Sequence, residues 1–459
     1  MWLDYLPVGL YLGALIWLGV RGSRRVKDAA DFAAAGEKYG APVIFASLAA
    51  SYVGGGFSSG NAARAFSSGI GSTLALMGFA LAMMAIGRWL VPGVARFRGA
   101  STVGGILERD YGKGARALTG GFAFLSCAGV VAAQMEAMGL TFRSLLGVSE
   151  TAGVLIGCGV VLAYTTLGGM QSVIGADMLQ FALLSLGMPL LLAGCLARTG
   201  GLSGLFHRLP APYFDPLNGV GPWGFLSLFL SLAVGEALAP PYTQRLLIGR
   251  SPAVTARATV WSGLFAVPFF AVTGLIGLAA YVLDPAADPA SAMPRMILRV
   301  LPAGLRGLVI AAMVSVILSA ADGFLNGAAL GLVEDLLIPL FPATPPRVRL
   351  GLLRYVNFLT GAGAVALALL LPGIFEILFL AYSFWCPVLL VPLAAAFRGV
   401  AAPRPVFYAA AVAGFLTALL WDLPLARPLG VEGSVVGLAV NALLFFGGIL
   451  ITKMRKRAK

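Results

Sequence analysis

The sequence predicts an all-α protein that crosses a membrane many times. Of its 459 residues, 59% are hydrophobic and only 11% are charged, whereas soluble domains carry roughly 25% charged residues. Because so apolar a chain cannot cover its surface with polar side chains, lipid must be its solvent. Thirteen apolar stretches reach the roughly 17 residues that a spanning helix needs, and only short connections separate them.

The thirteen predicted transmembrane helices cover most of the chain. The longest connections, near 22–41, 199–221 and 284–304, are too short for a soluble domain, and the last is expected to hold a short helix over 291–300. Basic residues follow the first stretch rather than precede it, so we expect a retained helix and not a signal peptide. The stretches are 5–21, 42–67, 70–95, 117–142, 150–167, 171–196, 222–247, 254–283, 305–338, 350–371, 373–397, 404–422 and 433–452.

The basic residues predict how the helices are oriented. When the N-terminus is placed outside and the helices alternate, the inner segments hold 24 of the 32 lysines and arginines. Basic residues collect on the cytoplasmic side of membrane proteins. The net charge of +13 lies in short clusters between apolar runs, including the tail 453–459, which favours topology signals over nucleic-acid binding. We expect a multi-pass protein of the cell inner (plasma) membrane, with its N-terminus outside and its C-terminus in the cytoplasm.

Residues that usually carry catalysis are scarce in this sequence. His207 is the only histidine, and the four cysteines lie in separate apolar stretches without CxxC or Cys/His spacing. A metal centre or a Ser-His-Asp triad is therefore not expected. We predict that the protein is not an enzyme and needs no cofactor other than a coupling ion.

Two predicted helices are interrupted at corresponding places. Gly54-Gly55-Gly56 breaks the helix 42–67, and Gly235-Glu236, followed by two prolines, breaks the helix 222–247. Each begins a run of five helices, and the two runs enter the membrane from opposite sides, which predicts a five-plus-five inverted repeat. The resulting parts are 1–41 (first helix and cytoplasmic loop), 42–198 (first repeat), 199–221 (outer loop), 222–398 (second repeat) and 399–459 (two extra helices and a basic tail).

The breaks themselves predict a binding cavity. Glycines loosen the backbone, and prolines remove hydrogen-bond donors and clash with the preceding turn. Carbonyl groups freed in this way are costly in lipid unless an ion, a solute or water satisfies them. A close helix crossing through small residues, or a simple proline kink, is the structural alternative.

Four stretches resemble the sodium:solute symporter family. The longest, from Tyr164 to Gln180, reads YTTLGGMQSVIGADMLQ and is similar to the family's Y-T-x-x-G-G-x-x-A-V-x-x-T-D-x-x-Q. The resemblance implies a leucine-transporter-like core, with one helix before it and two after it, and sodium-driven uptake of a small organic solute. The other stretches are DFAAAG at 31–36, Gln244-Arg245, and SAADGFLN at 319–326 followed by Glu334-Asp335.

The resemblance also implies the ligands of a sodium ion. They would be the backbone carbonyls of Ala50, Val53 and Val316, the hydroxyl of Ser319, and a second hydroxyl at position 320. This chain has Ala320 there, so one oxygen ligand is lost and proton coupling becomes a rival to sodium coupling.

Acidic residues fall well inside four predicted spans, at Glu136, Asp177, Glu236 and Asp322. Intramembrane carboxylates are costly, so each is a candidate functional residue. Asp177 and Asp322 match a region that forms a second cation site in some family members. They are expected to share a sodium ion, or one of them to hold a proton. For both residues, a structural contact to a neighbouring helix end or to an arginine is the alternative.

The expected solute site combines both breaks. Glu236 would either bind an ammonium group or cap the half-helix that follows it. Gln134 and Glu136 lie on one helix, and the resemblance favours Gln134 as the residue that faces the cavity. Tyr382 and Trp385 share a helix face and would either gate the cavity or only pack. The predicted substrate-binding residues are Gly54, Gly55, Phe57, Gln134, Gly235, Glu236, Tyr382 and Trp385.

The function expected from these observations is sodium-coupled uptake of a small organic solute by alternating access. An amino acid, a quaternary amine or a carboxylate would fit, and sugars are also compatible. A proton-coupled symporter of the same fold, a membrane solute sensor and a channel are the alternatives. The expected partners are the solute, a sodium ion or a proton, and the lipid bilayer, but not nucleic acid.

Overall fold

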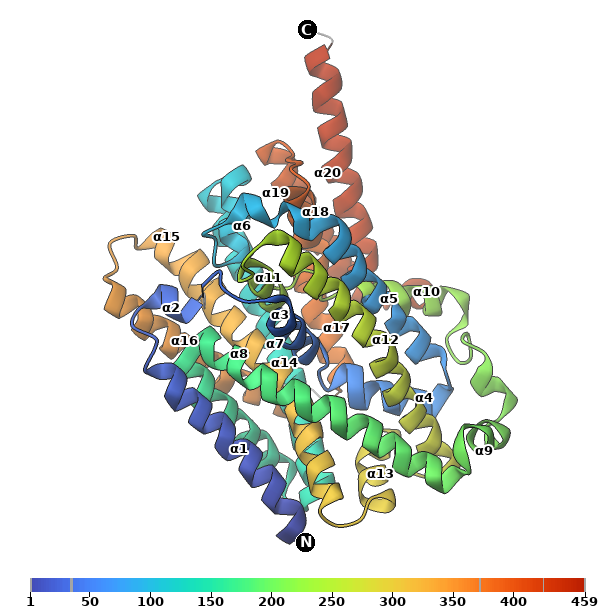
Figure 1. Ribbon diagram of the computed structural model, residues 1–459. Helices are drawn as coiled ribbons and strands as arrows, with labels where there is room; N and C mark the ends of the chain where they lie inside the picture. The colour runs from blue at the N-terminus through green and yellow to red at the C-terminus, as the bar shows by residue number, and fades with distance from the viewer. Residues whose placement is uncertain (1, 34–35, 371–372, 424, 458–459) are drawn as a thin grey trace.

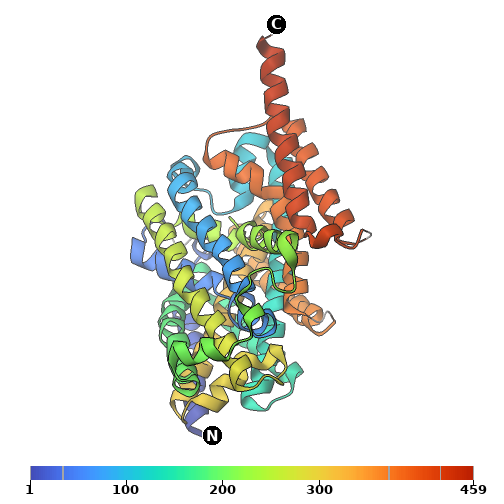
Figure 2. The ribbon, with the colours of Figure 1, turned by 90° about the vertical axis from the view of Figure 1, so that its right-hand side faces the viewer.

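The computed structural model is built almost entirely of helices in the residues that it describes, 2–33, 36–370, 373–423 and 425–457. The stretch DFAAAG, the predicted helix 350–371 and the tail 453–459 therefore lie partly outside the described residues. The N-terminus lies at one end of the molecule together with α13 (Ala292–Val300), and the C-terminal helix α20 (Gly433–Arg457) projects from the opposite end (Figures 1 and 2).

Many of the helices are long and apolar enough to cross a membrane. The described residues contain ten such helices, or up to eleven when the bent pair Ala41–Tyr52 and Gly56–Ser68 is taken as one span. This confirms a multi-pass membrane chain. The further spans are α1 (Trp2–Ser23), α5 with its extension (Gly71–Phe97), α7 (Lys113–Leu146), α8 (Glu150–Thr199), α12 (Pro252–Leu283), α14 with its extension (Leu305–Leu340), α16 (Pro346–Leu370), α17 and α18 together (Glu376–Phe397), α19 (Arg404–Asp422) and α20.

The first predicted break is present. Helix α3 (Ala41–Tyr52) ends just before the glycines, and a π-helical turn, Gly56–Gly60, leads into α4 (Asn61–Ser68). The two parts are bent by 64°. Three successive glycines leave this backbone free to depart from the α-helix.

The second predicted break is also present. Helix α10 (Gly221–Val234) ends one residue before Gly235, and α11 (Pro240–Leu247) begins at the first of the two prolines. Proline is well tolerated in the first turn of a helix, where its missing N–H would have no partner. Between them, Leu238 has a left-handed backbone with φ of 54°.

Helix α8 joins two of the predicted helices without a loop between them. Its backbone breaks at Gly169, where φ is 51° and ψ is −146°, and the two halves diverge from there (Figure 1). A Cβ atom at this position would lie 2.7 Å from the backbone oxygen of Phe32. Only glycine adopts this conformation readily, so one residue replaces the expected connection at 168–170.

The span of α14 forms the centre of the structure. Within its apolar window 94% of the residues are buried, compared with 17% for α20, and α14 packs against α7 and α8. Leu443, Leu450 and Ile451 of α20 are exposed. Large exposed apolar residues on a spanning helix are what contact with lipid requires.

A short helix in a predicted loop closes the end of the molecule opposite the N-terminus. Helix α6 (Val103–Tyr111) begins at Thr102, whose hydroxyl donates a 2.6 Å hydrogen bond to the buried Asp335 carboxylate. Arg116 on α7 binds Asp335 at 3.0 Å and Glu108 of α6 at 2.8 Å. These contacts tie α6 and α7 to the extension of α14.

Replacement of Gly169 by alanine is expected to destabilise the protein by about 1–3 kcal/mol, because the new Cβ would force an unfavourable backbone conformation against Phe32. The thermal unfolding midpoint of the purified protein in detergent measures this. Gly159→Ala is the matched control, because Gly159 is a helical residue of α8 with open space around it. A Gly169→Ala protein as stable as the Gly159→Ala protein would contradict the prediction.

Candidate functional site

Both helix breaks border one small cavity beside α14. Four predicted solute-site residues, Gly54, Phe57, Gln134 and Glu236, line it together with Ala320. The open space is about 10 Å³, which is room for about one water molecule. The cavity is therefore closed to an organic solute in this conformation. Its remaining lining residues are Ser51, Tyr52, Gly56, Val130, Phe324 and Leu378.

The first break is held by Gln134 on α7. The backbone N–H of Gly55 donates a 2.8 Å hydrogen bond to Gln134 Oε1. Gly54 N–H donates to the Tyr52 carbonyl at 2.9 Å, whereas in a continuous helix it would bond to Ala50. The Ala50 carbonyl is thereby released from its helical partner, as the predicted sodium site requires.

The glycines at this break are needed for close packing. A Cβ atom on Gly54 would lie 2.9 Å from Gln134 Nε2 and 3.0 Å from the Ala320 methyl group, and one on Gly55 would lie 2.6 Å from the Cβ of Ala137. The methyl group of Ala320 thus faces the break at the position where the family resemblance predicts a hydroxyl.

The second break is held by Glu236, Tyr382 and Trp385. The buried Glu236 carboxylate accepts hydrogen bonds from the hydroxyls of Tyr242 and Tyr382, the latter at 2.9 Å. Trp385 Nε1 donates to the carbonyl of Ala237 at 2.9 Å. Tyr382 and Trp385 are therefore fastened to the break in this conformation, and they do not line the closed cavity.

The expectation that Glu236 caps the following half-helix is wrong. The N-cap of α11 is Ala239, and no side chain caps it. The Glu236 side chain is occupied by the two tyrosine hydroxyls instead. Gly235 allows this arrangement, because a Cβ there would lie 2.4 Å from the Tyr382 ring.

Asp177 on α8 joins four helices through one buried ion pair and through hydrogen bonds. Its carboxylate binds the guanidinium of Arg245 on α11 at 2.8 Å, and neither side chain is exposed. It also accepts hydrogen bonds from Ser319 on α14 at 3.0 Å and from Ser47 on α3. Ser51 lies 3.5 Å from the same carboxylate. The predicted alternative of a contact to an arginine is therefore the one that the structure contains.

Asp322 lies one helical turn after Ser319 on α14. It is buried, and Tyr164 donates a 2.6 Å hydrogen bond to its Oδ2. Among the described residues its Oδ1 has no hydrogen-bond partner. The charge of Asp177 acts on Asp322, but each carboxylate is held by its own hydrogen-bond partners.

Several residues of this site were not predicted. Arg245 was noted only as part of the family resemblance, although a charged residue inside a membrane is a functional candidate in its own right. Ser47, Tyr164 and Tyr242 carry no comparable signal, because their roles depend on which helix each one faces. The remaining predicted ligands are also buried: Val53 lies just after α3 and Val316 lies on α14.

A family model and several characterised proteins match this chain. The model of the sodium:solute symporter family matches residues 32–344. The chain belongs to the sodium:solute symporter family. It is 25% identical to the high-affinity proline transporter PutP of Bacillus subtilis over 343 residues, which cover 71% of this chain and 72% of that protein. It is also 25% identical to the sodium/glucose cotransporter 2 of Rattus norvegicus, over 66% of this chain and 53% of that one.

Other relatives match over shorter regions. The sodium/myo-inositol cotransporter 2 of Oryctolagus cuniculus is 26% identical over 39% of this chain. The matched region spans about a third (32%) of that relative. These family members are transporters rather than enzymes.

Solved structures agree with the fold. A Na⁺-coupled sialic acid symporter, in a substrate-bound outward-open state, superposes with a TM-score of 0.86 at 18% identity and covers 98% of this chain and 97% of its own. MhsT, in complex with L-phenylalanine, has a TM-score of 0.53 at 15% identity and covers 90% of this chain and 99% of its own. The leucine-transporter-like core that the family resemblance implies is consistent with these neighbours.

Replacement of Arg245 by glutamine is expected to destabilise the protein by about 3–5 kcal/mol, because it leaves the Asp177 carboxylate buried without a counter-charge. The double variant Asp177→Asn/Arg245→Gln is expected to recover part of this loss, and thermal unfolding of the purified proteins measures both. Arg295→Gln, which removes an exposed ion pair with Asp284, is the control and should cost less than about 1 kcal/mol. Equal losses for Arg245→Gln and Arg295→Gln would argue against a structural ion pair.

Proposed function

We propose that this chain is a sodium-coupled symporter that takes up a small organic solute by alternating access. The observation that carries the proposal is the meeting of two broken helices beside α14, around a buried polar cluster, in a member of this family. Backbone groups freed inside a membrane protein serve as ligands for ions and solutes. Glycine-rich and proline-rich breaks at matching places supply such groups from both halves.

The proposed sodium site lies between α3 and α14. The carbonyls of Ala50, Val53 and Val316 and the hydroxyl of Ser319 would hold the ion, with Asp177 close by through its hydrogen bond to Ser319. Asp322 would serve a second cation site together with Asp177. Because Ala320 contributes no oxygen, the first site depends more heavily on the carbonyls of α3 than it would with a second hydroxyl.

The proposed solute site is the cavity between the two breaks, lined by Gly54, Phe57, Gln134 and Glu236. Four further residues would border this site, although they do not line the closed cavity: Gly55, Gly235, Tyr382 and Trp385. Since the cavity now holds about 10 Å³ of open space, binding requires movement of the helices that carry the breaks. Rocking of one helix bundle against the other would open it to one side of the membrane at a time.

The proposed topology has thirteen spans, a first repeat over 42–198 and a second over 222–398. It divides α8 at Gly169 and counts α10 with α11 as one broken span. The N-terminus lies outside and the C-terminus in the cytoplasm, as the distribution of basic residues favours. The two ends of the chain lie at opposite ends of the molecule (Figure 1), which supports an odd number of crossings.

Purified protein in liposomes is expected to accumulate solute only when an inward sodium gradient is present. Radiolabelled proline, choline and glucose are suitable first probes, because relatives that transport them are similar to this chain. An inside-negative potential should add to uptake, since one charge crossing 100 mV supplies about 2.3 kcal/mol, or roughly 50-fold accumulation. Uptake that follows a proton gradient and ignores sodium would contradict the proposal.

Ser319→Ala is expected to weaken sodium binding by about tenfold, and Ala320→Ser to strengthen it, because each changes the number of oxygen ligands by one. The increase of the unfolding midpoint with sodium concentration reports the affinity. Ser315→Ala is the control, since among the described residues that buried hydroxyl on the same helix bonds only to the carbonyl of Ala312. An unchanged sodium response in Ser319→Ala would remove Ser319 from the site.

A further inference from the structure

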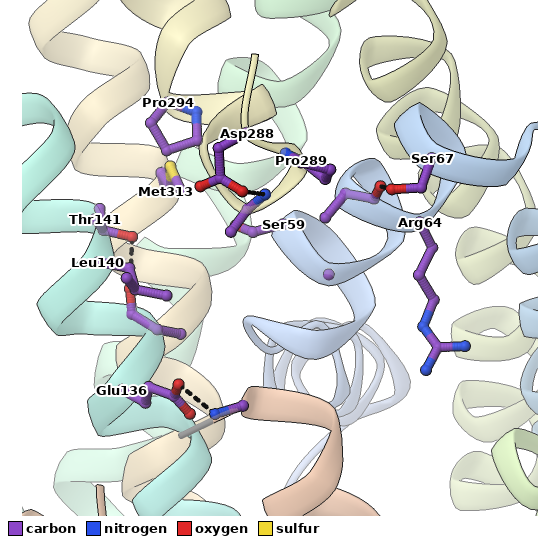
Figure 3. A pocket seen from close by; sticks show the side chains of 15 residues that line it. Ser59, Arg64, Ser67, Glu136, Leu140, Thr141, Asp288, Pro289, Pro294 and Met313 are labelled. Carbon is purple, nitrogen blue, oxygen red and sulfur yellow. Dashed lines mark hydrogen bonds between the residues drawn. The ribbon is translucent and has the colours of Figure 1, made fainter. Parts of the chain in front are cut away.

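A second and much larger cavity (Figure 3) is lined in part by α13, which lies at the same end of the molecule as the N-terminus (Figure 1). Its volume is about 380 Å³. Its walls come from α4, from α7, from the turn Pro289–Ser291 with α13, from α14, and from Gly373 just before α17 (Ile374–Trp385). We call it the outer cavity.

The outer cavity and the closed central cavity follow one another along the same two elements. On α7, Gln134 lines the central cavity and Glu136 lines the outer one. Along the π-helical turn, Phe57 lines the central cavity and Ser59 the outer one. Two residues of a helix correspond to about 3 Å along its axis. The two cavities therefore lie close to one another along both elements.

Glu136 lines the outer cavity and keeps one unsatisfied acceptor atom. The residue is 7% exposed, and its Oε1 accepts a 2.7 Å hydrogen bond from the backbone N–H of Gly373. Its Oε2 is buried and has no hydrogen-bond partner among the described residues. A buried carboxylate oxygen without a donor is costly, so a ligand that brings a donor there gains the corresponding free energy.

The charges around Glu136 favour a positive group. Asp288 also lines the outer cavity, and Glu150, which is paired with Arg143, and Glu376 are further charged groups that act on Glu136. Arg64 is the cationic residue of the lining, and it extends along the opposite wall, away from Glu136 (Figure 3), with its guanidinium 5.9 Å from the centre of the Phe379 ring. The side of the cavity at Glu136 is therefore negative.

The rest of the wall is mainly hydrocarbon. Its apolar side chains include Ala63, Leu140, Pro289, Pro294 and Met313. The described residues contain no group of three or more histidine, cysteine or acidic side chains that could hold a metal ion. One carboxylate oxygen among apolar side chains suits an organic ammonium ion better than a bare metal cation, which prefers several oxygen ligands.

We propose that the outer cavity binds the ammonium group of the incoming solute, with Glu136 Oε2 as its acceptor. The site is distinct from the central cavity and selects amines and amino acids over carboxylates without an amine and over neutral sugars. This inference deepens the proposed function and rests on it, because it takes the bound amine to be the transported solute. Glu136 acts before the solute reaches Gln134.

The test uses the full-length protein in nanodiscs and three probes of equal chain length: n-butylammonium, butyrate and n-butanol. Butylammonium should raise the unfolding midpoint of the wild-type protein, and the other two should not. Glu136→Gln should weaken the effect of butylammonium about 10- to 100-fold, as expected for the loss of a charge-assisted hydrogen bond. Ala63→Phe, which fills the cavity from the facing wall, should abolish it. Glu37→Gln, an exposed glutamate outside the lining and not among the charges that act on Glu136, is the matched control and should keep it.

The outcomes separate this proposal from the proposed function. Equal stabilisation of wild type and Glu136→Gln by butylammonium, or stronger stabilisation by butyrate, overturns the outer site, while a sodium response that Ser319→Ala reduces leaves the symporter proposal intact. Conversely, a wild-type protein that ignores sodium but loses its butylammonium response in Glu136→Gln and Ala63→Phe supports the outer site and contradicts sodium coupling.

Discussion

The peptide groups that the two helix breaks release are buried. Side chains packed around α14 form their hydrogen bonds. The amide of Gln134 receives the N–H of Gly55, and the indole of Trp385 donates to the carbonyl of Ala237. Each partner comes from a different helix, so the breaks bind α7 and α17 to the centre. The same requirement explains why glycine occupies positions where a Cβ would displace these partners.

The cavities form a sequence of compartments with different properties. The outer cavity of about 380 Å³ is open enough for a small molecule, whereas the central one of about 10 Å³ is not. At the opposite end, Asp335 and Arg116 join α6 to α7 and to the extension of α14. Passage of a solute through such a molecule requires the breaks to move and the contacts of Asp335 to be released.

Much of the fold could be predicted because lipid imposes simple rules on length and composition. The predicted helix 404–422 has the bounds of α19, and both breaks lie where glycine and proline interrupt the apolar pattern. The site was predicted less completely, because rotation of each helix about its axis decides which side chains meet. Arg245 could be identified as unusual in the sequence, but its pairing with Asp177 depends on how α11 faces α8. Glu236 does not cap the next half-helix, which was one of its two predicted roles, because the hydroxyls of two tyrosines bind its carboxylate.

The pairing of Arg245 with Asp177 has an electrical consequence. A single charge displaced through a potential of 100 mV exchanges about 2.3 kcal/mol with the field, but two opposite charges that move together exchange almost nothing. The ion pair therefore holds four helices together while remaining nearly invisible to the membrane voltage. A protein built in this way leaves the voltage to act on its cargo and on carboxylates such as Asp322 of α14, for which the described residues contain no ion pair.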